Sequence, residues 1–320
     1  MKKSHSRVLV LILALVFLMA LAACGGAGDP VSSDTAAETP AQAPETPAQA
    51  PASPAQTPES PAPPPESSAP PPETTAPPPE TPAQSAPLPA EPVELIVFAA
   101  ASMTETMEEI AVLYSAVAPN VTIVYNFDSS GTLLTQIQEG AVCDIFISAA
   151  QRQMNTLDDD GELLAGTRFD LVENKVALVV PAGNPADIHT FEDAANASLL
   201  ALGNSDVPVG QYSEEIFTNM GVWNDEFLSR VTLGGNVKEV TTWVSEGSVD
   251  CGVVYATDAF SAGLDIVASA PEGTLQTPVV YPAAAIGATE NPDAAIAFLD
   301  YLKTPEASAV FESVGFAIVK

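Results

Sequence analysis

The stretch Glu94–Glu105, ELIVFAAASMTE, decides how the globular part of the chain is organised. It begins with the continuous apolar run Leu95–Phe98, which is typical of a buried strand, and continues with three alanines. Ser102 and Glu105 have the S-x-x-E spacing of a capping box, which predicts a helix that begins at Ser102. Free backbone N–H groups at such a helix start, together with the helix dipole, attract anions. An ordinary strand-to-helix turn capped by a serine has the same pattern. This stretch alone therefore does not distinguish an anion site from such a turn.

Three other strand-to-helix junctions have the same character. The apolar segment 121–127 leads into DSSG at 128–131, and two further helix starts read VPVG at 207–210 and NVK at 236–238. Ligands of open α/β sheets bind beyond the carboxyl ends of the strands. Four helix starts that face one point would therefore form an anion site, which no single junction would predict.

Short apolar strands alternate with helices over residues 93–320, and this pattern indicates an α/β fold whose sheets are covered on both faces. We expect strands at 94–99, 121–127, 144–149, 176–181, 199–202, 252–255 and 279–286. We expect helices at 102–117, 131–139, 151–158, 210–220, 224–229, 238–246, 292–303 and 305–313.

The N-terminal part is not expected to fold into a core. Residues 1–23 combine basic residues, an apolar run and the ending LAA before Cys24, which predicts a lipoprotein signal peptide and a lipid-modified Cys24. The alternative for this apolar run is a transmembrane anchor. Residues 24–92 hold Cys24 and a segment rich in Pro, Glu and Thr, such as PPPETTAPPPETP. This composition predicts a disordered linker that holds the domain away from a membrane.

Composition excludes several classes of function. The net charge is −31, and three of the ten Lys and Arg residues lie in the signal peptide, so a basic surface for nucleic acid is not expected. The two histidines, His5 and His189, do not support a catalytic triad, and no C-x-x-C metal motif is present. We therefore expect no enzyme activity and no cofactor, and we expect Cys143 and Cys251 to be free, buried thiols. An anionic ligand would have to be held by neutral donors.

At this point the residues resemble a known family. The segments FAAASMTE, FDSSGTLLTQIQEGAVCDIFISAAQRQM, NSDVPVGQY, GVVYATDAF and FLDYLKTPEASAVFESVGF, in this order, look like those of the molybdate-binding proteins of ABC transporters. The resemblance implies a two-lobed type II periplasmic-binding-protein fold with a hinge of crossing strands. It implies a first lobe of about 93–175 and 283–320, a second lobe of about 176–282, and an oxyanion in the cleft.

The resemblance also implies which residues hold the ligand. Five residues would donate hydrogen bonds to molybdate, so that no residue ligates the metal directly. Ser102 would use its hydroxyl and its backbone N–H, and Ser130, the second serine of the adjacent pair, would donate as well. The remaining donors would be the backbone N–H groups of Val209 and Val237 and the phenol of Tyr255. Asp128 stands where many relatives have a small residue. Its carboxylate either caps the helix or faces solvent, or it points into the cleft and disfavours a dianion.

The prediction is therefore an extracytoplasmic lipoprotein, a monomer on the outer face of the cell membrane. It would bind molybdate, and tungstate as well, and deliver the anion to the permease of an ABC importer. A binder of sulfate or another oxyanion is the alternative within the same class. A lipid-anchored interaction or structural module without a ligand is the alternative from another class.

Overall fold

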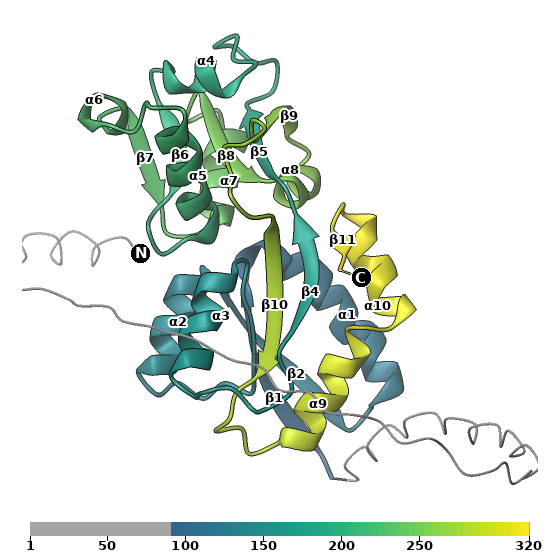
Figure 1. The fold of residues 1–320 in the computed structure, drawn as a ribbon. Coiled ribbons are helices and arrows are strands. Elements are labelled where there is room, and N and C mark those ends of the chain that lie inside the picture. The colour runs from purple at the N-terminus through teal and green to yellow at the C-terminus, as the bar shows by residue number, and fades with distance from the viewer. Residues whose placement is uncertain (1–90, 320) are drawn as a thin grey trace, which may run out of the picture. The chain divides into compact units, whose positions relative to one another are not determined.

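The computed structural model describes residues 91–319, which lie in one compact unit. The predicted signal peptide, Cys24 and the linker up to residue 90 lie outside the described residues. Two mixed sheets organise the described part and give it two α/β lobes, as predicted (Figure 1). None of the helices in residues 91–319 has the length and apolar character needed to cross a membrane.

The first sheet has the strand order β11-β4-β10-β3-β1-β2. Its strands are β1 (Val93–Ala100), β2 (Val121–Asp128), β3 (Ile145–Ile147), β4 (Phe169–Asn174), β10 (Val279–Ala285) and β11 (Ala317–Ile318). Strand β1 pairs in parallel with β2 and β3, whereas β10 runs antiparallel to β3 and β4. The carboxyl ends of β1, β2 and β3 therefore lie at one edge, where the serine-rich junctions follow.

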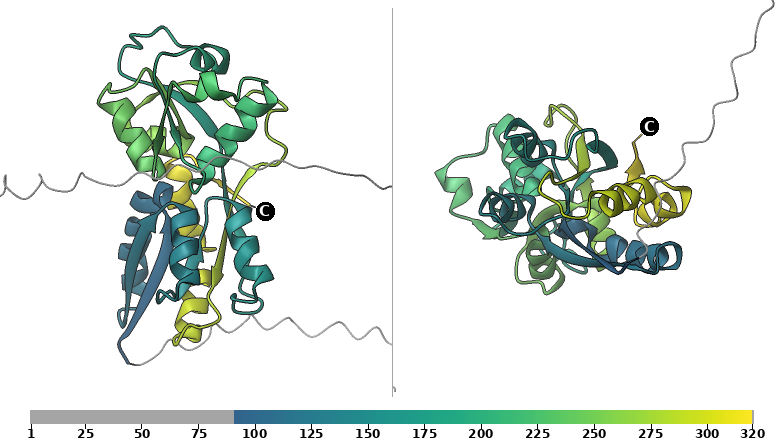
Figure 2. Two further views of the ribbon diagram at one scale, coloured as in Figure 1. Left: turned by 90° about the vertical axis from the view of Figure 1, so that its left-hand side faces the viewer. Right: turned by 90° about the horizontal axis from the view of Figure 1, so that it is seen from below.

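Helices cover both faces of this sheet, which explains the continuous apolar run of β1. Leu95 and Val97 belong to one core cluster, with Met107 of α1 (Thr104–Val117). Phe98 points to the other face and packs in a second cluster with residues of α2 (Ser130–Gln138) and α3 (Gln151–Asp159). Helices α9 (Pro292–Tyr301) and α10 (Pro305–Ser313) lie on the side of α1, away from α2 and α3 (Figures 1 and 2).

The second sheet has the order β7-β6-β8-β5-β9. Its strands are β5 (Val176–Val180), β6 (Leu200–Gly203), β7 (Val231–Gly234), β8 (Cys251–Tyr255) and β9 (Asp265–Ser269). Its helices are α4 (Phe191–Ala195), α5 (Pro208–Asn219), α6 (Asp225–Leu228), α7 (Val237–Ser245) and α8 (Ala256–Ala262). Every residue of β5 and β8 is buried, because helices cover both faces of these central strands.

Two chain segments connect the sheets. Strand β4 continues into β5 with Lys175 alone between them, and the segment 270–278 leads from β9 back to β10 (Figure 1). Both connections lie beside each other because β4 and β10 pair over Val279–Ala283. These two crossing segments form the hinge that the family resemblance implies.

One prediction at the opening stretch is wrong. Residues Ala101–Met103 form a 3-10 turn and α1 begins at Thr104, with no side-chain cap on either element. The Ser102 hydroxyl forms a hydrogen bond with the Tyr281 hydroxyl, and the Glu105 carboxylate accepts one from Nζ of Lys238, so neither side chain completes a capping box. Each side chain finds a partner far away in the sequence, which local spacing does not encode.

The structure contains all predicted strands and helices and adds short ones that the sequence pattern missed. The additional elements are β4, β7, β9, β11, α4 and α8. Strands β7 and β9 lie at the edges of the second sheet and are only partly buried, so they lack the continuous apolar run used to find strands.

Candidate functional site

A small cavity lies between the two lobes, at the carboxyl ends of β1, β2 and β8. Its lining comes from the first lobe and the second lobe together and consists of Ala100, Ala101, Ser102, Asp128, Ser129, Ser130, Ala149, Val207, Pro208, Val237 and Tyr255. Its volume is about 10 Å³, the space of about one water molecule. The two lobes therefore lie close together at this cavity, and an anion can enter only when they separate.

Ser102 lies in the 3-10 turn after β1 and is 5% exposed. Its Oγ lies 2.9 Å from the phenol oxygen of Tyr281 on β10. Ser102 lines the cavity, and its backbone N–H lies at the start of the turn, where helical N–H groups lack an intrahelical acceptor. The hydroxyl and the backbone are therefore both placed to donate into the cavity.

The two adjacent serines before α2 have different roles. The Oγ of Ser129 accepts from the backbone N–H of Thr132 and donates to the Thr132 hydroxyl, so Ser129 is the N-cap and its proton is used within the helix. Ser130 is fully buried, and its Oγ accepts from the backbone N–H of Ala149 at 2.9 Å. Within the described residues its own proton has no acceptor, so Ser130 is the serine that can donate to a ligand.

The second lobe presents two helix starts. Val237 is the first residue of α7 and lines the cavity. Val209 is the second residue of α5 and is fully buried, but the cavity wall beside it is made by Val207 and Pro208. Among residues 91–319 the backbone N–H groups of Val209 and Val237 find no acceptor, as expected for the first turn of a helix. Both remain free for an anion.

Tyr255 ends β8 and is 1% exposed. Its hydroxyl donates to the carbonyl oxygen of Ala149 across the cavity, over a long distance of 3.4 Å. Burial raises the pKa of this phenol well above its usual value, and the neighbouring phenols and the Asp258 carboxylate act in the same direction. Tyr255 therefore stays protonated and remains a donor.

Asp128 ends β2 and lines the cavity, which the sequence left undecided. Its Oδ1 accepts from the backbone N–H of Ser129 at 2.7 Å and from the Asn236 side-chain amide of the second lobe at 3.3 Å. The carboxylate therefore helps to hold the N-terminus of α2 and bridges the lobes, in addition to facing the cavity.

The cavity wall contains no lysine or arginine among the described residues. The cation nearest in sequence to a wall residue is Lys238, whose Nζ lies 2.8 Å from both carboxylate oxygens of Glu105 and 3.3 Å from Oδ1 of Asp258. This cation is therefore engaged by carboxylates. The cavity instead has the positive ends of dipoles, which come from four helix starts, two serine hydroxyls and one phenol. This arrangement is suited to an anion.

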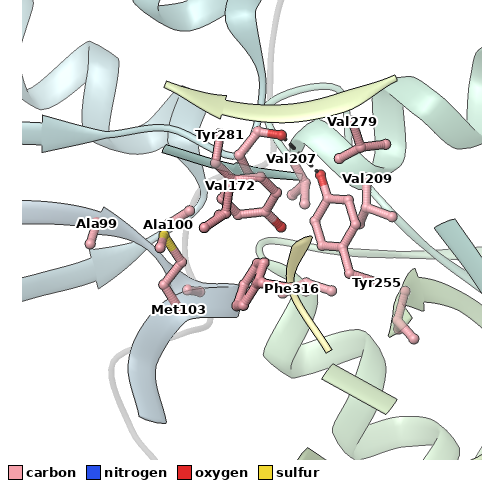
Figure 3. Close-up of a cluster of buried hydrophobic side chains, with 14 of the residues drawn as sticks. Ala99, Ala100, Met103, Val172, Val207, Val209, Tyr255, Val279, Tyr281 and Phe316 are labelled. Carbon is pink, nitrogen blue, oxygen red and sulfur yellow. Dashed lines mark hydrogen bonds between the residues drawn. The ribbon is translucent and has the colours of Figure 1, made fainter. Parts of the chain in front are cut away.

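Sequence reasoning missed Tyr281 and Asn174, which lie behind Ser102 in the hinge. The Tyr255 and Tyr281 rings belong to one buried cluster with Met103 and Phe316 (Figure 3). Their ring centroids are 5.6 Å apart in an edge-to-face arrangement. A tyrosine on a predicted strand carries no local signal of this contact with Ser102, because the two residues are 179 positions apart.

Cys143 and Cys251 are free and buried, as predicted. Burial raises the pKa of each thiol to about 12, so neither forms a reactive thiolate at neutral pH. The described residues contain no group of three or more His, Cys, Asp or Glu side chains able to hold a metal ion. His189 is exposed, and its Nε2 lies 2.9 Å from Oδ1 of Asp187.

Comparison with known proteins shows the family of this chain. The profile of the family described as bacterial extracellular solute-binding protein matches residues 95–317. The Bacillus subtilis protein named as the ABC transporter substrate-binding lipoprotein YvgL is 38% identical, over 70% of this chain and 86% of its own length. The molybdate-binding protein ModA of Haemophilus influenzae is 36% identical, over 70% of this chain and 90% of its own.

A solved structure from Clostridium difficile, named as the substrate-binding domain of a molybdenum ABC transporter, is 35% identical. It aligns with a TM-score of 0.55 and covers 71% of this chain and all of its own. The family consists of binding proteins, which agrees with the predicted absence of catalysis. The chain therefore belongs to the bacterial extracellular solute-binding proteins.

Proposed function

We propose that this protein binds molybdate, and tungstate as well, in the cavity between its lobes. The observation that carries the proposal is the direction of the hydrogen bond at Ser130. Ser130 accepts from the Ala149 backbone, which leaves its proton to point toward the cavity. The two relatives named for molybdenum or molybdate, at 35% and 36% identity, support this choice of ligand.

The donors that we assign to the anion are the predicted ones. The hydroxyls of Ser102 and Ser130 and the phenol of Tyr255 would donate directly, and the backbone N–H groups of Val209 and Val237 would donate from helix starts. Each hydrogen bond to a charged acceptor contributes about 1.5–3 kcal/mol, so several donors offset the cost of removing water from a dianion. The ligand is the cargo, and no cofactor is needed for this role.

Binding and hinge motion would be coupled. We assign residues of about 93–175 and 283–320 to the first lobe and about 176–282 to the second. Ser102 and Ser130 then lie in the first lobe, and the other three donors lie in the second. Neither set alone surrounds a tetrahedral anion, so a ligand that contacts both sets favours the closed state.

Calorimetry on the full chain, purified in detergent, tests the assignment with molybdate, tungstate, sulfate, phosphate and chromate. We expect molybdate and tungstate to bind at least about tenfold more tightly than sulfate, a difference of about 1.4 kcal/mol. A preference for phosphate would contradict the proposal, because it would make Asp128 an acceptor for a protonated anion. Absence of heat with every anion would favour an interaction module without a ligand.

We further propose that the protein is tethered through a lipid on Cys24 and hands its ligand, as a monomer, to the permease of an ABC importer. The LAAC ending of the leader supports the anchor, and the Bacillus relative is named as a lipoprotein. A tethered donor with a long linker would stay close to a permease in the same membrane.

A further inference from the structure

Ser102 is one end of a chain of buried hydrogen bonds that runs into the hinge. Its Oγ lies 2.9 Å from the hydroxyl of Tyr281, and the side-chain amide nitrogen of Asn174 lies 3.2 Å from the same hydroxyl. The same amide nitrogen lies 2.9 Å from Oγ1 of Thr257 in the second lobe. Asn174 ends β4 and Tyr281 lies on β10, so the chain of bonds follows both hinge strands.

The orientation of the Asn174 amide follows from a neighbour that can only donate. The backbone N–H of Lys175 donates to Oδ1 of Asn174 at 2.8 Å. The oxygen of the amide must therefore face Lys175, and its NH₂ group must face Tyr281 and Thr257. Both amide protons are used in this way, one on each hydroxyl oxygen.

The direction of the next bond follows from the first. The Tyr281 oxygen accepts from Asn174, and Tyr281 is fully buried, so its own proton must find a protein acceptor. Ser102 Oγ is the acceptor that the described residues offer. If Ser102 donated instead, the phenol proton of Tyr281 would be buried without a partner, which costs about 1–3 kcal/mol. Burial also raises the pKa of Tyr281 well above its usual value, so the proton is present.

We propose that Tyr281, oriented by Asn174, is a positioning residue that turns the Ser102 hydroxyl into a donor toward the ligand. Ser102 receives the Tyr281 proton at its oxygen and therefore directs its own proton into the cavity that it lines. In the same manner, Oγ of Ser130 accepts a hydrogen bond from the backbone N–H of Ala149. Both serines are thus held as donors by groups behind them, and this arrangement favours an anion without a proton over one that needs an acceptor.

The inference rests on the proposed oxyanion function and assigns a role to two residues outside the cavity wall. It also relates ligand binding to the hinge, because the bonds that orient Ser102 come from β4 and β10. A hinge rotation that separates Tyr281 from Ser102 would leave the Ser102 hydroxyl free to rotate. Its hydrogen bond to the anion would then be weaker.

A double-mutant cycle in the full chain, measured by calorimetry with molybdate, tests the inference. Tyr281→Phe keeps the ring and removes the hydroxyl that donates to Ser102. We expect it to weaken molybdate binding about tenfold, which is less than the full contribution of one hydrogen bond to a charged group. In a Ser102→Ala background the same substitution should change affinity less than about twofold, because the hydroxyl that it orients is gone. In a Ser130→Ala background, the matched control, it should again cost about tenfold.

Asn174→Asp is the second variant, and it covers the case in which Tyr281→Phe does not fold. The carboxylate would accept the phenol proton and turn the Ser102 proton away from the cavity. Its effect should again depend on Ser102, whereas direct repulsion of the anion by the new charge would persist in the Ser102→Ala background. Equal losses in both backgrounds, for either folded variant, would overturn the positioning role while leaving the proposed function intact. If no anion in the panel binds the wild-type chain, both proposals are overturned.

Discussion

The Nζ atom of Lys238 lies 2.8 Å from both carboxylate oxygens of Glu105, and this ion pair joins the start of α7 in the second lobe to the start of α1 in the first. It lies beside the cavity between the lobes, since Val237 precedes Lys238 and lines the cavity wall. The pair can form only when the lobes are close, so it stabilises the closed arrangement.

Glu105→Gln should weaken ligand binding only modestly, because Glu105 is 52% exposed and solvent-exposed ion pairs contribute about 0.2–1 kcal/mol. The loss should shrink at high salt, which screens the wild-type pair. Calorimetry at two ionic strengths measures both effects. Glu109→Gln, one turn further along α1 and also exposed, is the matched control and should leave affinity unchanged. A loss that does not depend on salt would contradict the ion-pair explanation.

Asp258→Asn should stabilise the protein at neutral pH. Burial raises the pKa of this carboxyl to about 6, although the ion pair with Lys238, whose Nζ lies 3.3 Å from Oδ1, lowers it. Because the folded pKa lies above the unfolded value of 3.8, the folded state binds more protons between about pH 4 and 6, and wild-type stability falls as pH rises through this window. The gain on substitution should be at most about 3 kcal/mol above pH 6.5 and should disappear toward pH 4. Urea unfolding at a series of pH values measures it; a gain independent of pH would contradict the assignment.

Gly131→Ala should obstruct closure without unfolding either lobe. A Cβ at this position would lie 2.4 Å from the backbone oxygen of Asp206, which belongs to the opposite lobe. The ligand-free melting temperature should stay near that of the wild type, whereas molybdate affinity should fall by at least about tenfold, the scale of 1.4 kcal/mol. Small-angle scattering should show a larger radius of gyration at saturating molybdate than for the wild type. Gly235→Ala, whose new Cβ meets its nearest atom at 3.5 Å, is the control. Normal affinity of Gly131→Ala would show that the lobes need not approach this closely.

Substitution of the adjacent serines Ser129 and Ser130 should affect different properties, the stability of the fold in one case and molybdate affinity in the other. Ser129→Ala removes the N-cap of α2 and should lower the free energy of unfolding by about 1 kcal/mol with little effect on molybdate affinity. Ser130→Ala should weaken binding by about 1.5–3 kcal/mol, because it removes a hydroxyl that donates to charge. Thermal unfolding and calorimetry on both variants measure this difference. Equal affinities in the two variants would remove Ser130 from the ligand set.

Cys24→Ala should abolish lipid modification and release the protein from the membrane fraction. The prediction rests on the LAAC ending of the leader, since Cys24 lies outside the described residues. Mass spectrometry of the wild-type N-terminus should find a modified cysteine. A Cys24→Ala protein that stays uncleaved in the membrane would instead identify residues 8–20 as a transmembrane anchor.

The predictions of β1, α2 and α7 at the cavity were accurate because their signals are local. An apolar run such as Leu95–Phe98 is long enough to identify a buried strand covered on both faces. The helix starts at Ser130 and Val237 each follow a polar N-cap residue, Ser129 and Asn236, which is a local signal of a helix start. The short edge strands β7 and β9 escaped prediction, because a half-exposed strand has no such run.

The sequence by itself determined the α/β class, the starts of α2, α5 and α7 and the lack of cations among the candidate donors, because these depend on residue type and on spacing within one turn or strand. The tertiary structure alone decided the hydrogen-bond partners of Ser102 and Glu105. Ser102 and Glu105 have the spacing of a capping box, yet their partners are Tyr281 and Lys238, 179 and 133 positions away. A hydroxyl or carboxylate bonds whichever donor or acceptor the fold brings within about 3 Å, and that distance is set by sheet order and hinge geometry.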